Sequence, residues 1–301
     1  MTFDLKQFLA VKQKVIEQHL SDLLTAETSA PASLIAAMRY SLLAPGKRLR
    51  PALVFMAAQA AGGSDAQALP AAAAVEMIHT YSLIHDDLPA MDDDDLRRGM
   101  PTCHKKYGEA LAILAGDGLL TLAFQTLAQH FPARTAAACC LALAQGAGAA
   151  GMVGGQVDDL AWERGDLPRN LDALEHIHAC KTGALFRACL KLGVFAVQSE
   201  RAEGTDQNLL ARLDTYGRSF GLVFQITDDL IDVEGNAADA GKEVNKDAAR
   251  GKLTYPSLLG VVESRRRAQE LAQQALGAVA PIGDAAMPLV ALMQFVLTRD
   301  R

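Results

Sequence analysis

The chain has 301 residues, of which 50% are hydrophobic and only 5% aromatic, and its formal net charge is −6. This length and hydrophobic content allow a large core in one or two domains, and the negative charge argues against a general nucleic-acid-binding protein. Alanine and leucine dominate the apolar residues, which favours helices over sheets.

The sequence reads as a succession of helices, without the alternating pattern that is typical of strands. Breaks fall at glycine, proline or aspartate, as at Pro45-Gly46 and from Gly235 to Gly241. Since no linker or change of composition divides the chain, we expect one all-α domain over residues 1–301. The predicted helices span residues 4–24, 32–44, 49–61, 66–88, 108–130, 133–160, 171–198, 205–233, 252–276 and 285–297.

Several features concern the compartment of the protein. The amphipathic N-terminal segment lacks the apolar core of a signal peptide. Glycine, glutamine or charge interrupts the apolar runs elsewhere, so we expect no membrane-spanning helix and no stable membrane insertion. Five cysteines without framework spacing favour a reduced, cytoplasmic protein. The glycines of Gly146–Gly151 match a dinucleotide-binding pattern, but their helical context indicates close helix packing instead.

A first basic group lies in Gly46-Lys47-Arg48-Leu49-Arg50, where a turn leads into a helix. Lys47 and Arg50 are three residues apart and can hold one anion between them. A helix start adds free N–H groups and positive potential. An isolated group of this kind is most often only surface charge, so its meaning depends on its neighbours.

A first acidic segment follows the apolar helix, with six aspartates between Asp86 and Asp95. Carboxylates are unfavourable at the negative C-terminal end of a helix unless a cation is bound. Asp86 and Asp92 are about 600° apart on a regular helix and do not share a face. Pro89 interrupts the helix, and we therefore expect the broken segment to turn Asp92 back towards Asp86, where Mg²⁺ can bind.

A second acidic segment has a helical spacing. Gln225, Asp228, Asp229 and Asp232 stand at i, i+3, i+4 and i+7, which predicts that all four share one face of a helix. Three like charges on one face destabilise a helix unless a cation bridges them. The spacing therefore predicts a second metal-binding surface.

Further basic residues stand close to these acidic segments in the sequence. They are Arg97-Arg98, Lys181 beside Thr182, and Lys242, Lys246 and Lys252. Carboxylates that hold Mg²⁺, together with lysine and arginine side chains, are what a bound diphosphate requires. The joint placement indicates a magnesium–diphosphate site.

Four motifs, in this order along the chain, resemble the trans-isoprenyl diphosphate synthases: GKRLRP at 46–51, HDDLPAMDDDDLRRG at 85–99, KTG at 181–183 and QITDDLID at 225–232. The likeness runs from about residue 34 to 260, includes GGQVDDL at 154–160 and GKLTYP at 251–256, and is closest to the bacterial farnesyl diphosphate synthases. It implies the isoprenoid synthase fold, a helical bundle of about ten or more helices around a deep central cavity with the two acidic motifs facing each other, and a homodimer.

The resemblance also implies the roles of particular residues. It implies three Mg²⁺ ions, with Mn²⁺ as a possible substitute, on Asp86, Asp92 and Asp228, with Asp87 and Asp232 in support. It implies that Arg97, Lys181, Lys242 and Lys252 hold the allylic diphosphate and that Gly46, Lys47, Arg50, His79 and Arg98 bind isopentenyl diphosphate. Thr182 and Gln225 lie near the developing cation in this reading.

The implied reaction is that of a magnesium-dependent dimethylallyltranstransferase and geranyltranstransferase. An allylic diphosphate ionises, isopentenyl diphosphate attacks, and a proton is lost. Tyr81, roughly 7.5 Å along the helix from Asp86, and the adjacent Ser82 are candidates for limiting the product to farnesyl diphosphate. A geranylgeranyl diphosphate synthase, a terpene cyclase and a non-catalytic subunit are the alternatives.

One position departs from the family pattern. The loop after the second motif usually reads GK-x-x-GKD, and here Asn245 replaces the second glycine. Asparagine tolerates a positive φ better than most residues. We expect the loop still to close, whereas the sequence leaves the rate of closure open.

Overall fold

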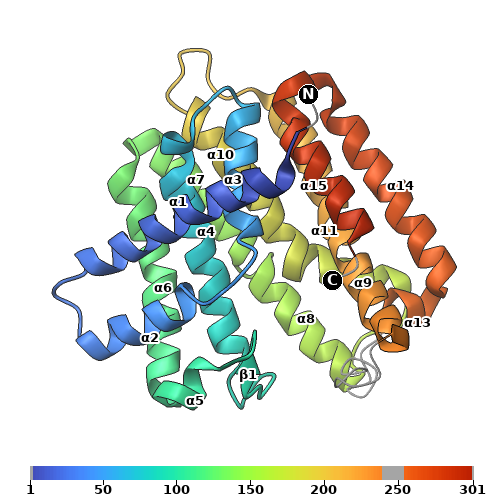
Figure 1. Ribbon diagram of the computed structural model, residues 1–301, viewed down its shortest axis with the longest axis horizontal. Helices are drawn as coiled ribbons and strands as arrows, with labels where there is room; N and C mark the ends of the chain where they lie inside the picture. The colour runs from blue at the N-terminus through green and yellow to red at the C-terminus, as the bar shows by residue number, and fades with distance from the viewer. Residues whose placement is uncertain (1–2, 239–253, 300–301) are drawn as a thin grey trace. The chain divides into compact units, whose positions relative to one another are not determined.

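The computed structural model describes residues 3–238 and 254–299, and the side chains of residues 3–234 and 254–299. Helices account for most of this part of the chain, which confirms the predicted all-α class (Figure 1). Two compact units are present, and each is described by itself. The N-terminal unit comprises Asp4–Cys140 and Leu192–Thr205, and the C-terminal unit consists mainly of Leu141–Lys191 and Asp206–Arg301. A single domain over residues 1–301 stays a prediction.

The N-terminal unit is built around helix α4 (Asp65–Asp86), which packs against α3 (Leu49–Ala60) and α6 (Glu109–His130) (Figure 1). Gln67 accepts a 3.0 Å hydrogen bond from the backbone N–H of Ser64, which caps the start of α4. The small side chains of Ala71–Ala74 are fully buried and allow close helix packing. The other elements are α1 (Leu5–Ala26), α2 (Ala32–Leu42), β1 (Leu96–Arg97), β2 (Met100–Pro101) and α5 (Cys103–Tyr107).

The C-terminal unit is built around the long helix α11 (Gln207–Ala238), which packs against α14 (Val261–Val279) and α15 (Met287–Thr298). Its core includes the fully buried rings of Tyr216 and Phe220, which stack at 5.7 Å. The remaining elements are α8 (Met152–Arg164), α9 (Leu171–His178), the π-helical turn η1 (Ala179–Gly183), α13 (Tyr255–Leu259) and η2 (Ala280–Ala286). Helices α7 (Ala133–Ala147) and α10 (Ala184–Gln198) contribute residues to both units.

Several elements differ from the predicted ones, among them the single helix expected over 252–276, which Gly260 divides into α13 and α14. The predicted helix over 133–160 is two helices, because the chain breaks between α7 and α8 at Gly148–Gly151. The expected helix packing at the first glycine of this segment is confirmed, since a Cβ on Gly146 would lie 2.6 Å from the Cβ of Ala188. The short antiparallel hairpin of β1 and β2 was not predicted.

The expectation that no helix resembles a membrane span is wrong by the criteria of length and composition alone. Among the described residues, three segments meet them: Glu109–His130, Ala133–Arg164 and Val261–Thr298. Alanine and leucine give these helices a high mean hydropathy even where polar residues interrupt them. Between 33% and 44% of each apolar window is buried inside the protein.

Candidate active site

The first acidic segment turns back on itself as predicted. Helix α4 ends at Asp86, and the backbone N–H of Asp92 donates a 2.8 Å hydrogen bond to the Asp86 carbonyl. The N–H of Asp93 donates to the Leu88 carbonyl at 3.2 Å, and Asp93 has a left-handed φ of 51°. The turn therefore places the backbones of Asp86 and Asp92 side by side, although they are six residues apart.

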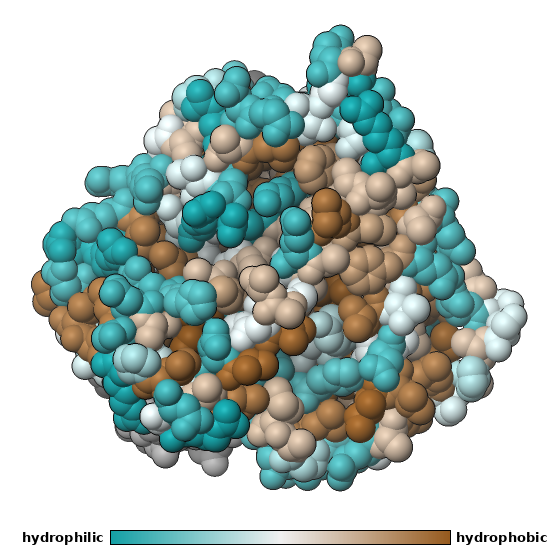
Figure 2. Space-filling view, turned by 180° about the vertical axis from the view of Figure 1, so that it is seen from behind, coloured by the Kyte–Doolittle hydropathy of each residue, from teal (hydrophilic) through white to brown (hydrophobic). Residues whose placement is uncertain are grey.

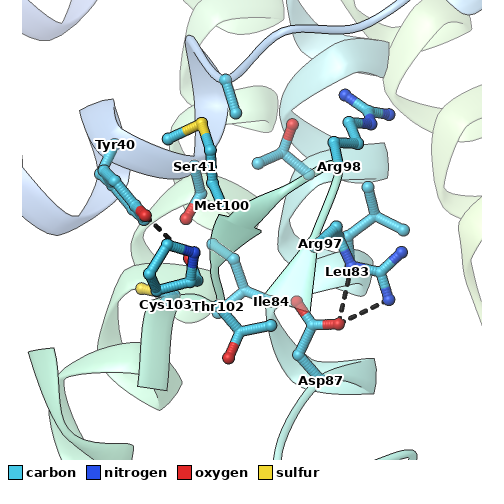
Figure 3. Close-up of a pocket in the computed structure, with 13 residues that line it drawn as sticks. Tyr40, Ser41, Leu83, Ile84, Asp87, Arg97, Arg98, Met100, Thr102 and Cys103 are labelled. Carbon is cyan, nitrogen blue, oxygen red and sulfur yellow. Dashed lines mark hydrogen bonds and ion pairs between the residues drawn. The ribbon is translucent and has the colours of Figure 1, made fainter. Parts of the chain in front are cut away.

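Asp87 lies in the interior, only 3% exposed, and forms an ion pair with Arg97. Arg97 Nε donates to Asp87 Oδ1 at 2.7 Å, and Nη2 lies 2.5 Å from the same oxygen (Figure 3). Burial raises the pKa of the Asp87 carboxyl, and the Arg97 guanidinium opposes that shift. The structure thus brings these two predicted site residues together as a pair, with Asp87 fixing the position of Arg97.

The hairpin explains how two consecutive arginines are presented differently. Arg97 pairs with Met100 across the strands, which leaves a two-residue turn of Arg98 and Gly99 with φ values of 53° and 77°. Positive φ at both positions is typical of the tight turns that suit twisted strands. Arg98 Nη1 donates to the Pro45 carbonyl at 2.8 Å. A Cβ on Gly46 would lie 2.3 Å from the same nitrogen, so glycine leaves room for the guanidinium.

Arg50 and His79 meet in the same unit. Arg50 Nη1 lies 3.1 Å from His79 Nε2. Burial, and then the charges of Arg50, Arg98, Arg97 and Arg48, lower the pKa of His79 well below its usual value. His79 is therefore neutral near pH 7 and can accept a hydrogen bond from Arg50. Lys47 is exposed beside this arginine-rich group, which suits an anionic ligand.

Arg48 has a structural role that the sequence did not reveal. It precedes α3 with a φ of 48° and is 5% exposed. Its Nη1 donates to Glu76 Oε1 at 2.7 Å, and its Nη2 donates to the Ala44 carbonyl at 2.8 Å. This buried ion pair holds the turn that carries Lys47.

A pocket of about 420 Å³, part of which is open to solvent, lies between the hairpin and helices α2 and α4 (Figure 3). Its wall is largely apolar, with Leu83, Ile84 and Met100, and it includes Arg97 and Arg98. Tyr40 donates a 2.8 Å hydrogen bond to the Pro101 carbonyl across it. This hydrogen bond connects β2 of the hairpin to α2.

In the C-terminal unit, Lys181, Thr182 and Gln225 line one cavity of about 560 Å³, part of which is open to solvent. Lys181 and Thr182 stand on the π-helical turn η1, and turns of this kind are frequent at functional sites. Lys181 Nζ donates to Asp159 Oδ2 at 2.6 Å. A Cβ on Gly155 would lie 2.2 Å from the backbone nitrogen of Lys181, so only glycine permits this approach of α8.

The four residues of the second acidic motif all stand on α11, so their helical spacing is as predicted, but they differ in burial. Asp229 is 8% exposed and accepts a 2.9 Å hydrogen bond from the backbone N–H of Tyr255. Asp228 and Asp232 are partly exposed. Asp228 pairs with Arg299 at 2.6 Å, a partner near the end of the chain that no local pattern indicated.

The two candidates for limiting product length lie on α4. Tyr81 is 7% exposed, and its ring meets that of His85 edge to face at 5.8 Å. Ser82 Oγ donates to the His79 carbonyl at 2.9 Å. Tyr81 is thus a fixed aromatic ring one turn and more before Asp86.

Four predicted residues, Lys242, Asn245, Lys246 and Lys252, lie outside the described residues. In the part of the chain that the structure describes, no three His, Cys, Asp or Glu side chains form a group that could hold a metal ion. Each acidic motif instead offers a pair of partly exposed carboxylates, Asp86 with Asp92 and Asp228 with Asp232. Such pairs fit Mg²⁺, which is usually held by one or two carboxylates together with substrate phosphates.

Comparison with known proteins assigns the family. A model described as polyprenyl synthetase matches residues 31–285. The chain is 44% identical to a farnesyl diphosphate synthase of Escherichia coli, over 99% of this chain and 100% of that protein. It is 43% identical to a chloroplastic geranylgeranyl pyrophosphate synthase of Arabidopsis thaliana, over 99% of this chain and 83% of that protein.

A solved structure agrees with these sequence relatives. The crystal structure of an FPP/GFPP synthase from Zymomonas mobilis matches with a TM-score of 0.84 and 37% identity, over 97% of this chain and 98% of that one. The family model covers most of the chain and includes both acidic motifs. The chain belongs to the polyprenyl synthetase family.

Proposed function

We propose that this protein is a prenyltransferase that condenses isopentenyl diphosphate with dimethylallyl or geranyl diphosphate to give farnesyl diphosphate. The observation that carries the proposal is the cavity shared by Lys181, Thr182 and Gln225. It combines a cation for a diphosphate with polar oxygens for a developing carbocation, and Asp229 of the second acidic motif also lines it. The names of the relatives support the same reaction.

The allylic diphosphate is assigned to Arg97 and Lys181, with Lys242 and Lys252. Two carboxylates support this assignment. Asp87 holds the Arg97 guanidinium in position, and Asp159 holds the ammonium group of Lys181. Charge-assisted hydrogen bonds to phosphate oxygens are short and strong. These side chains therefore bind the leaving group and favour its departure.

Asp86, Asp92 and Asp228, with Asp232, would hold Mg²⁺, three ions in all, and Mn²⁺ is an alternative. When bound, the metal neutralises the diphosphate and so assists cleavage of the allylic C–O bond. The protein residues supply the ligands, and the proposal requires both acidic motifs to act on one substrate.

Isopentenyl diphosphate is assigned to Lys47, Arg50, His79 and Arg98. A neutral His79 orients the Arg50 guanidinium without adding a charge. The isopentenyl double bond then attacks the allylic cation, and the proton lost from the product passes to the departed diphosphate. The oxygens of Thr182 and Gln225, which line the same cavity, stabilise the cation.

Incubation with labelled isopentenyl diphosphate and geranyl diphosphate tests the reaction. A prenyltransferase forms a longer diphosphate only when both substrates and Mg²⁺ are present. A terpene cyclase would consume the allylic substrate alone, and a non-catalytic subunit would consume neither. Either of these two results refutes the proposal.

Product length rests on Tyr81, whose buried ring lies on the same helix as Asp86. Chromatography of the dephosphorylated product is expected to show C15 for the unmodified protein and longer products for Tyr81→Ala. Tyr107→Ala, a tyrosine change on α5, is the matched control and is expected to leave C15 unchanged. A C20 product from the unmodified protein would favour the second candidate, a geranylgeranyl diphosphate synthase, which the Arabidopsis relative's name supports.

We further propose that the protein is cytoplasmic, that it forms a homodimer, and that it does not insert stably into a membrane. Five free cysteines suit a reducing compartment. Ile113 and Leu114 on α6 are 44% and 55% exposed, and a second copy would cover them. Hydrophilic side chains interrupt the apolar ones on the face in Figure 2. Sedimentation of the purified protein tests the dimer, and cell fractionation tests the location.

A further inference from the structure

A buried cation near the end of the chain contacts the second acidic motif. Arg299 Nη2 lies 2.6 Å from Asp228 Oδ1, and 3.0 Å from both Thr227 Oγ1 and the Phe224 carbonyl. The guanidinium carbon lies 4.2 Å from the centre of the Phe224 ring, a distance that suits a cation–π interaction. Together these contacts form a binding site on α11 for the Arg299 guanidinium.

Helix α15, which directly precedes Arg299, packs against α11. Leu289, Leu292 and Met293 of α15 are fully buried. Tyr216 of α11 donates a 2.8 Å hydrogen bond to the Leu289 carbonyl. Helix α15 ends at Thr298, and Arg299 continues with extended dihedral angles, φ −70° and ψ 143°. The position of the guanidinium is therefore set by the fold of the unit rather than by a loose tail.

The two partners differ in exposure. The Arg299 side chain is 4% exposed, whereas that of Asp228 is 46% exposed. Solvent, and any dissolved cation, can therefore approach the carboxylate on the side that does not face Arg299. A desolvated guanidinium that loses its compensating charge costs more free energy than the loss of an exposed ion pair does.

We propose that Arg299 is a placeholder cation, meaning a side-chain charge that balances Asp228 before a divalent metal binds and competes with the metal for that carboxylate. The inference rests on the proposed function, which assigns Asp228 as a metal ligand. It adds a residue at the end of the chain that sets how tightly the second acidic motif takes up metal.

Calorimetric titration of Mn²⁺, with and without inorganic pyrophosphate, tests the proposal on the full-length protein. Arg299→Gln is expected to lower the apparent Mn²⁺ dissociation constant about three- to tenfold, the factor that corresponds to about 0.7–1.4 kcal/mol. Without metal, the same variant is expected to have a lower melting temperature than the unmodified protein, and Mn²⁺ is expected to narrow that gap. Arg299→Lys keeps the charge and is expected to restore most of the original dissociation constant.

Arg218→Gln is the matched control, because Arg218 lies on the same helix and forms an i, i+4 pair with Asp214. It is expected to leave Mn²⁺ binding unchanged. Unchanged or weaker Mn²⁺ binding in Arg299→Gln overturns the proposal, as does an Arg299→Lys protein that behaves like Arg299→Gln.

Asp228→Asn separates this inference from the proposed function. If this variant binds Mn²⁺ as well as the unmodified protein does, the assignment of Asp228 as a ligand is wrong and both proposals fall. If Asp228→Asn loses a binding event while Arg299→Gln changes nothing, only the placeholder role is refuted.

Discussion

The buried pair of Arg48 and Glu76 makes a quantitative prediction. Both side chains are nearly inaccessible, 2% and 3% exposed, with 2.7 Å between Nη1 and Oε1. Removing one partner of such a pair costs about 3–5 kcal/mol, because it leaves an uncompensated buried charge. Glu76→Gln keeps the volume and a hydrogen-bond acceptor, and Arg48 retains Glu17 and the Ala44 carbonyl. We therefore expect a loss near the lower limit, about 3 kcal/mol.

Urea unfolding followed by circular dichroism measures this loss as a fall in the transition midpoint at constant slope. In a thermal scan, a protein of this size should lose roughly 6–12 °C, at about 2–4 °C per kcal/mol. Glu17→Gln is the control, since Glu17 contacts the same arginine at 3.3 Å but is 35% exposed. It should cost less than about 1 kcal/mol. Equal losses in the two variants would refute the argument that burial determines the contribution.

Two other predictions concern the site. Gly155→Ala should lower the free energy of unfolding by about 1–3 kcal/mol, because the added Cβ meets the backbone of Lys181. Gly277→Ala is the control, since its Cβ enters open space and should stabilise α14 by about 0.5–1 kcal/mol. Urea unfolding of both variants measures the difference. The lowered pKa of His79 means that the unfolded chain binds a proton that the folded protein does not. The free energy of unfolding should therefore fall as the pH drops below about 6.5. His79→Gln should reduce the slope of the free energy of unfolding against pH. An unchanged slope would show that His79 does not titrate as argued.

The helices were predictable where local signals and burial agree. The apolar run before Asp86 predicted α4 because its buried face continues without interruption, and Pro89 predicted its end. The return of Asp92 to Asp86 also followed from this break. These features depend on neighbours in sequence, so the sequence contains the information needed to predict them.

The remaining features depend on contacts between distant residues. The hairpin at Arg98 has strands of two residues, too short to show any alternation. The π-helical turn that carries Lys181 interrupts a continuous helical pattern without a proline. The burial of Asp229 was not predictable, because helical spacing alone does not show that the N–H of Tyr255 requires an acceptor. The partner of Asp228 is 71 residues away, and no local pattern could have identified it.

Three non-glycine residues in the described chain have a positive φ, and they are Arg48, Asp93 and Arg98. Each such conformation costs of order 1–3 kcal/mol, and all three adjoin the predicted diphosphate and metal ligands. Replacing any of them by glycine would relax the backbone but remove a charged group. At Asp93 and Arg98, glycine variants should therefore resist heat better but react more slowly. At Arg48, the loss of the buried ion pair with Glu76 should cost more than the relaxed backbone gains.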